Sequence, residues 1–81
     1  MPPSFNARAD GARRAMQITV NGQSRDLPHS ATIAGLLELL GVNRKAVVVE
    51  KNLKIIDRAL FDRELVQEGD RIEIIRLVGG G

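Results

Sequence analysis

The sequence predicts an α+β fold in which one helix crosses a mixed sheet of four or five strands. Three observations carry this prediction. Residues 16–20 alternate between apolar and polar side chains and run directly into an Asn-Gly pair, which indicates a hairpin. Residues 33–40 repeat apolar side chains at helical spacing, and β-branched apolar runs follow later in the chain. A hairpin, a helix and returning strands together form one sheet with one covered face.

The opening hairpin is predicted from a short stretch of residues. Met16, Ile18 and Val20 alternate with polar residues, which is the period of a half-buried strand. Asn-Gly at positions 21–22 favours a type I′ turn, because both central positions of that turn need a positive φ. The returning strand is expected at residues 23–27, and the proline that follows ends it.

A single amphipathic helix is expected over Ile33–Leu40. Ser30 and Thr32 each offer an N-cap oxygen, and Gly41 stands where a left-handed residue commonly ends a helix. Apolar residues recur at i, i+3, i+4 and i+7, a spacing that favours packing in a core over display as a binding stripe. These residues are Ile33, Leu36, Leu37 and Leu40.

The second half of the chain supplies the remaining strands. In order, the expected elements are a strand at 46–49, a turn at Lys51-Asn52, a short strand with Leu53, Ile55 and Ile56, a helical turn within 57–65, a turn at 68–70 and a last strand at 71–77. This order is the plan of the ubiquitin-like β-grasp fold, in which the last strand lies at the centre of the sheet beside the first. The expected core of this domain, residues 16–77, consists of Ile18, Val20, Ile33, Leu36, Leu37, Leu40, Val47, Val49, Ile72 and Ile74.

Composition excludes several classes of chemistry. The chain has no cysteine and one histidine, so disulfides, thiolate metal sites and thiol catalysis are excluded, and no metal or cofactor site is expected. Its net charge of +2 comes from three arginines and one aspartate in residues 1–15, which leaves nine basic and nine acidic residues in the remainder. The domain has neither a basic stripe nor aromatic platforms, so we expect no binding to nucleic acid.

The N-terminal segment and the cellular location are predicted from the absence of apolar runs. Residues 1–15 contain two prolines and show no apolar periodicity, so they are expected to form a disordered extension. No run of about 18 apolar residues could span a membrane, and no secretory signal is recognisable. We therefore expect a cytoplasmic protein without membrane association.

The chain as printed ends in Gly79, Gly80 and Gly81, directly after the predicted last strand. Terminal glycines are often simply frayed. A flexible tail, residues 78–81, that follows a core strand nevertheless projects in a defined direction, and glycines without Cβ atoms can thread a narrow channel. Such a tail can deliver a C-terminal carboxylate into the active site of another protein.

Three short motifs stand out along the domain: residues 16–22 (MQITVNG), 32–37 (TIAGLL) and 68–74 (EGDRIEI), the last of which leads into the glycine tail. With these motifs the sequence resembles the ThiS family, the β-grasp sulfur carriers of thiamine biosynthesis. The sequence departs from the common family pattern after the third strand, where Leu53 stands in place of a usual glycine and Asp57 in place of a common proline.

The resemblance implies a protein co-substrate rather than an enzyme. A ThiF-like activating enzyme would use ATP and Mg²⁺ to adenylate the carboxylate of Gly81, and Gly79 and Gly80 would thread its channel. A cysteine desulfurase or a sulfurtransferase would then supply the sulfur that converts the adenylate into a thiocarboxylate. A ThiG-like thiazole synthase would accept this sulfur.

The last strand breaks the expected alternation. Ile72 and Ile74 share one face, while Ile75 and Leu77 share the other. A bulge or a central position could bury both pairs, which is the more common arrangement. Alternatively, Ile75, Leu77 and Val78 form an exposed apolar patch that docks the carrier on its partners.

Other functions remain open at this stage. The small subunit of molybdopterin synthase shares the fold and the tail chemistry, although proline or phenylalanine commonly precedes its terminal glycines and residues 75–78 contain neither. A ubiquitin-like modifier would instead attach Gly81 to lysines. In a plain β-grasp interaction module the tail would be inert, and Gly81 could then be deleted without effect.

Overall fold

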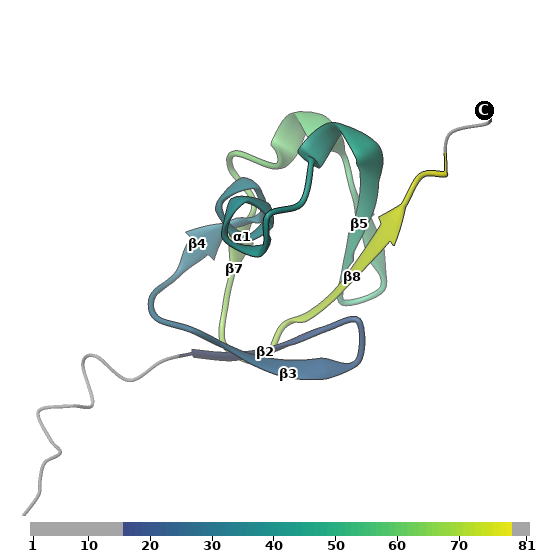
Figure 1. The fold of residues 1–81 in the computed structure, drawn as a ribbon. Helices are drawn as coiled ribbons and strands as arrows, with labels where there is room; N and C mark the ends of the chain where they lie inside the picture. The colour runs from purple at the N-terminus through teal and green to yellow at the C-terminus, as the bar shows by residue number, and fades with distance from the viewer. Residues whose placement is uncertain (1–15, 79–81) are drawn as a thin grey trace, which may run out of the picture.

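The computed structural model describes residues 16–78, and the predictions for residues 1–15 and for Gly79–Gly81 lie outside this range. A five-stranded sheet has the order β3-β2-β8-β5-β6, and helix α1 covers one of its faces (Figure 1). A second, two-stranded sheet pairs β4 with β7. The elements are β2 (Met16–Val20), β3 (Gln23–Leu27), β4 (Ala31–Thr32), α1 (Ile33–Leu40), β5 (Val47–Lys51), β6 (Lys54–Ile56), β7 (Leu65–Val66) and β8 (Arg71–Arg76), with 3₁₀ turns η2 (Arg44–Ala46) and η3 (Arg58–Leu60).

The sheet is mixed, and the last strand lies at its centre as predicted. Strand β2 pairs antiparallel with β3 and parallel with β8, and β8 pairs antiparallel with β5 on its other side. The turn between β2 and β3 has φ values of 49° at Asn21 and 82° at Gly22. Two successive positive φ values are those of the predicted hairpin turn. The β-grasp fold expected from the order of elements is therefore confirmed.

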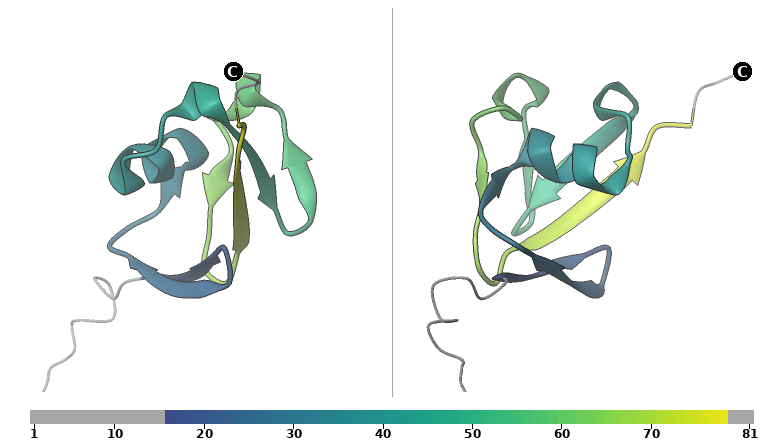
Figure 2. Two further views of the ribbon diagram at one scale, coloured as in Figure 1. Left: turned by 45° about the vertical axis from the view of Figure 1, so that its right-hand side comes forward. Right: turned by 60° about the vertical axis from the view of Figure 1, so that its left-hand side comes forward.

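Helix α1 has the bounds and both end signals that the sequence predicts. The hydroxyl of Thr32 accepts a hydrogen bond from the backbone N–H of Gly35 at 3.1 Å, which caps the N-terminus. At the other end Gly41 is left-handed with φ 71°, and the N–H of Val42 donates to the carbonyl of Leu37 at 2.9 Å. The helix lies across one face of the sheet, as the two rotated views show (Figure 2).

The core lies between α1 and the face of the sheet that α1 covers. Eight of the ten predicted core residues are buried, and the other two, Leu40 and Ile74, are half-buried and pack against them. The sequence analysis missed three further buried residues, which are Leu27, Phe61 and Val66. Phe61 follows η3, and its carbonyl accepts a hydrogen bond from the N–H of Ala34 at 2.9 Å, which attaches this segment to the start of the helix.

The turn after β5 differs from its prediction. It is formed by Asn52 and Leu53, both with positive φ (52° and 73°), and not by Lys51-Asn52. The expectation that Leu53 lies in a strand is therefore wrong, and its side chain is 74% exposed. Strand β5 begins at Val47 because Ala46 closes η2, and β8 ends at Arg76. The expected helical turn within residues 57–65 is η3.

A polar cluster holds this turn against the start of β8. The buried carboxylate of Asp70 accepts hydrogen bonds from the backbone N–H of Gln67 at 2.8 Å and from the side-chain amide of Asn52 at 3.0 Å. The ammonium group of Lys51 lies 2.8 Å from a carboxylate oxygen of Glu64 and 3.7 Å from Asp70. The hydrogen bond to Glu64 raises the pKa of Lys51 against the opposing effect of burial.

Within residues 16–78, no helix has the length and apolar character needed to cross a lipid bilayer.

Candidate functional site

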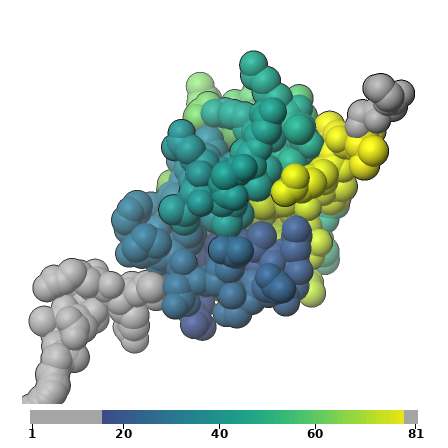
Figure 3. All heavy atoms as spheres, viewed as in Figure 1, coloured from purple at the N-terminus to yellow at the C-terminus, as the bar shows by residue number. Residues whose placement is uncertain are grey.

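The candidate site is the C-terminal end of β8, where the predicted last strand leaves the domain. On the side of β8 that faces β5, the backbone hydrogen bonds continue one residue beyond the strand, since the N–H of Leu77 donates to the carbonyl of Ala46 at 2.9 Å. On the other side, only Arg71 and Ile72 pair with β2. The last residue described, Val78, is 91% exposed. The space-filling view shows the end of β8, in yellow, at the surface of the domain (Figure 3).

The side chain of Asn21 extends the pairing of β8 beyond the end of β2. The backbone N–H of Asn21 donates to the carbonyl of Ile72 at 2.9 Å. Its side-chain oxygen accepts from the N–H of Ile74 at 2.7 Å, and its side-chain nitrogen donates to the carbonyl of Ile74 at 3.3 Å. A single turn residue therefore replaces a missing strand neighbour and fixes the direction in which β8 leaves the sheet.

The structure shows which of the apolar residues in β8 are buried and which are exposed. The register from Val47↔Arg76 to Lys51↔Ile72 is continuous, so no bulge interrupts this part of the ladder. Ile72 is fully buried, whereas Ile75 is 46% and Leu77 51% exposed. The expectation that both pairs are buried is wrong, because α1 covers only one face of the sheet.

We use the term open face for the side of the five-stranded sheet that α1 leaves uncovered. The residues of β8 and β5 alternate between the two faces, so Ile75 and its cross-strand partner Val48 share the open face. Ile55 of β6 lies on the same face and is 69% exposed. The apolar side chains of the open face are Val48, Ile55, Ile75 and Leu77, and Val78 follows directly.

The sequence analysis missed Val48 and Ile55 as members of this surface. Residues 46–49 were predicted as a strand, and a continuous apolar run does not show which of its side chains face the core. The face occupied by Ile55 depends on its pairing with Glu50, which only the register reveals.

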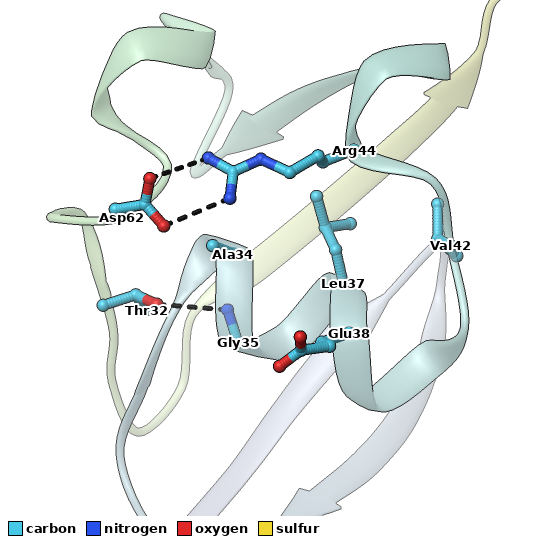
Figure 4. Close-up of a pocket in the computed structure, with 8 residues that line it drawn as sticks. All are labelled: Thr32, Ala34, Gly35, Leu37, Glu38, Val42, Arg44 and Asp62. Carbon is cyan, nitrogen blue, oxygen red and sulfur yellow. Dashed lines mark hydrogen bonds and ion pairs between the residues drawn. The ribbon is translucent and has the colours of Figure 1, made fainter.

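The opposite side of the domain has a cavity of about 420 Å³ beside the start of α1 (Figure 4). At its rim the guanidinium group of Arg44 donates two hydrogen bonds to the carboxylate of Asp62, at 2.9 and 3.1 Å. This pairing lowers the pKa of Asp62. Because Asp62 already occupies the guanidinium group, we assign the pair a structural role in joining η2 to the segment after η3.

Candidate metal ligands are dispersed over the described part of the chain. Among residues 16–78, no group of three histidine, aspartate or glutamate side chains lies close enough together to hold a metal ion. What these residues offer chemically is an exposed apolar face beside a strand that is anchored along both edges and leads out of the domain. Gly79, Gly80 and Gly81, which form the predicted tail, follow in the sequence.

Comparison with known proteins gives concordant matches. The model of the ThiS family matches residues 18–81. The sulfur carrier protein ThiS of Escherichia coli is 30% identical over 66 residues, which cover 82% of this chain and all of that protein. A crystal structure of a thiamine biosynthesis protein (ThiS) from Geobacter metallireducens superposes with a TM-score of 0.72 at 35% identity, and the match covers 82% of this chain and 100% of that one.

Two longer relatives are thiazole synthases. The enzyme of Paramagnetospirillum magneticum is 38% identical and that of Magnetococcus marinus 35% identical, each over 66 residues and 82% of this chain. The matched region is 20% of each of these proteins, so the chain spans about a fifth of their length. The family match over most of the chain, the full-length match to a ThiS protein and the superposition agree with one another, and the chain belongs to the ThiS family.

Proposed function

We propose that this chain is a sulfur carrier of thiamine biosynthesis and that the C-terminal carboxylate of Gly81 carries the sulfur. The observation that supports this most directly is the end of β8 in a chain of the ThiS family. The strand is held by β5 on one side and by β2 and Asn21 on the other, and it leads to the exposed Val78. A rigid strand of this kind aims the residues that follow it at a defined point of a partner.

The proposed chemistry lies in the partners, and the carrier contributes the acyl group. A carboxylate is a poor acyl donor, so an activating enzyme with ATP and Mg²⁺ first joins the Gly81 carboxylate oxygen to the α-phosphate, and pyrophosphate leaves. A sulfur nucleophile, supplied as a persulfide by a cysteine desulfurase or sulfurtransferase, then attacks the acyl carbon and AMP leaves. Cleavage of the sulfur–sulfur bond by a thiol gives the thiocarboxylate.

Thiazole synthase is the proposed acceptor of the sulfur. Two curated thiazole synthases contain, in one polypeptide, a region similar to this chain. Joining a carrier-like region to the enzyme in a single chain supports the proposal that the two act together. The open face of this chain provides a surface for the contact with the enzyme.

We assign Ile75, Leu77 and Val78 to docking, and Gly79 and Gly80 to passage through the partner's channel. The three docking residues are exposed and precede the glycines without interruption. Exposed apolar surface of this kind is typical of interaction sites. Because side chains larger than hydrogen would widen the tail, glycine at positions 79 and 80 keeps it thin enough for a narrow passage.

The proposal is tested by ATP–pyrophosphate exchange with the cognate activating enzyme, using the wild-type carrier, a Gly80→Val variant and a variant without Gly81. Valine should block the channel, and deleting Gly81 should shorten the reach by about 3.5 Å and misplace the carboxylate. Both variants should fold like the wild type and neither should support exchange. Intact mass after addition of a sulfur donor should show replacement of one oxygen by sulfur in the wild type alone.

Near-normal exchange with both variants would refute the role of the Gly81 carboxylate. A plain interaction module would then be the better description of the protein. A thiocarboxylate that forms normally but transfers its sulfur to a pterin precursor rather than to thiazole synthase would preserve the carrier chemistry and overturn its assignment to thiamine biosynthesis.

A further inference from the structure

Two glutamates lie side by side on the open face. Glu50 of β5 and Glu73 of β8 are direct cross-strand partners, so their Cα atoms are separated by roughly 5 Å. Both side chains are half-buried. Like charges placed directly opposite each other destabilise an antiparallel pair. The register therefore places two like charges opposite each other in the middle of the sheet.

The two glutamates take part in none of the ion pairs found within residues 16–78, which join Arg44 to Asp62 and Lys51 to Glu64 and Asp70. Three of their neighbours on the open face are apolar, since Ile55 lies beside Glu50 on β6, and Val48 and Ile75 form the next cross-strand pair. One cation shares this face: Arg71 lies two residues before Glu73 on β8, and it is exposed.

The open face consequently has two zones in a fixed order along β8. The apolar zone of Ile75, Val48 and Leu77 adjoins the end of the strand, and the acidic pair comes two residues earlier. Two residues of an extended strand span about 7 Å. A complementary partner must present a cation about 7 Å from its apolar contact, on the side away from the glycine tail.

We propose that Glu50 and Glu73 together receive an arginine side chain of thiazole synthase, an inference that rests on the proposed function. The guanidinium group is planar and has five donors, so one arginine can donate to both carboxylates at once. Arginine is also enriched at the apolar centres of protein interfaces. Its binding replaces the repulsion between the glutamates by attraction and fixes the orientation of the carrier, with the tail directed to one side.

The test measures binding of the full-length carrier to the cognate thiazole synthase at low and high NaCl, for wild type and for the Glu50→Gln/Glu73→Gln variant. Glutamine keeps the shape of each side chain and removes its charge. We expect the Kd of the variant to rise at least about tenfold at low salt, because an arginine at the interface loses its charged partner. The salt dependence of the Kd should become weaker than in the wild type.

Thermal unfolding of the free carrier separates this role from a structural one. The double variant should have a Tm equal to or above that of the wild type, because the repulsion between the glutamates is removed. The double substitution is thus expected to lower the affinity without lowering the stability. The matched control is Glu38→Gln on the exposed side of α1, remote from the open face, which should leave the Kd unchanged.

A Kd within twofold of the wild type would overturn the inference. Unchanged binding together with self-association of the variant would also overturn it, because the glutamates would then serve only to keep copies of the carrier apart. Failure of the proposed function is detected separately. In that case the wild-type carrier would form no thiocarboxylate, whereas failure of the inference alone leaves thiocarboxylate formation intact in both proteins.

Discussion

Replacing Asn21 by glycine should weaken the attachment of β8 to the rest of the sheet. Asn21 has a φ of 49°, and its side chain makes two hydrogen bonds with the backbone of Ile74, at 2.7 and 3.3 Å. Glycine adopts the same backbone conformation without strain, so the substitution removes the hydrogen bonds and leaves the turn possible. The variant therefore isolates the contribution of the side chain.

The expected loss follows from three contributions. Each lost hydrogen bond contributes about 0.5–1.5 kcal/mol net, with the lower half of this range expected because Asn21 is exposed and water can replace it. Glycine adds about 0.5–1 kcal/mol through the greater freedom of the unfolded chain. The free energy of unfolding should thus fall by about 1.5–3 kcal/mol. An Asn21→Asp variant keeps the acceptor for the N–H of Ile74, loses one hydrogen bond and has no glycine contribution, so it should lose about a third as much.

Urea denaturation of the full chain measures these differences, provided that the denaturant dependence of the unfolding free energy is unchanged between variants. Hydrogen exchange of the Ile74 amide gives an independent measurement, because its N–H donates to Asn21. The amide should exchange faster in Asn21→Gly and remain protected in Asn21→Asp. A glycine variant within about 0.5 kcal/mol of the wild type, with Ile74 still protected, would refute the argument.

Three further predictions concern the core, the polar cluster and the N-terminal segment. The Leu37→Ala variant should lose about 2–5 kcal/mol of unfolding free energy, since Leu37 is 1% exposed, and a loss below about 1 kcal/mol in urea denaturation would contradict the packing of α1 on the sheet. The pKa of Lys51 is raised above its ordinary 10.5, so its stabilising effect is complete below that pH and is lost as the pH rises through the folded-state pKa. A pH titration of the unfolding free energy should therefore show a smaller alkaline decline in Lys51→Met, and an unaltered alkaline decline would show that the ion pair with Glu64 contributes nothing. Removing residues 1–15 should leave pyrophosphate exchange unchanged, and a loss of exchange would show that this segment takes part in activation.

Features set by neighbouring residues could be predicted from the sequence. The hairpin turn needed only Asn21-Gly22, and the helix needed Thr32 at one end and Gly41 at the other. The turn at Asn52-Leu53 was misplaced because leucine rarely adopts a positive φ, and a sequence pattern therefore gives it little weight there.

Features that depend on pairing between distant segments could not be predicted. Alternation in β8 divides its apolar residues between two faces, but only the position of α1 shows that Ile75 is on the uncovered one. The opposition of Glu50 and Glu73 requires the register of β5 and β8. The strands β4 and β7 have two residues each, too few to show a period, and they form only because the loops bring them together.

The central position of β8 also determines when the domain can form during synthesis. Strand β8 is the last element described, yet it is the strand that joins the β2–β3 hairpin to the β5–β6 hairpin. The side chain of Asn21 forms its hydrogen bonds with Ile74, which lies 53 residues further along the chain. A nascent polypeptide that lacks β8 has two hairpins with no shared neighbour, and such non-local pairing is completed late. Translation interrupted before β8 therefore releases a fragment without the complete sheet, and the domain can fold only once this last strand has been made.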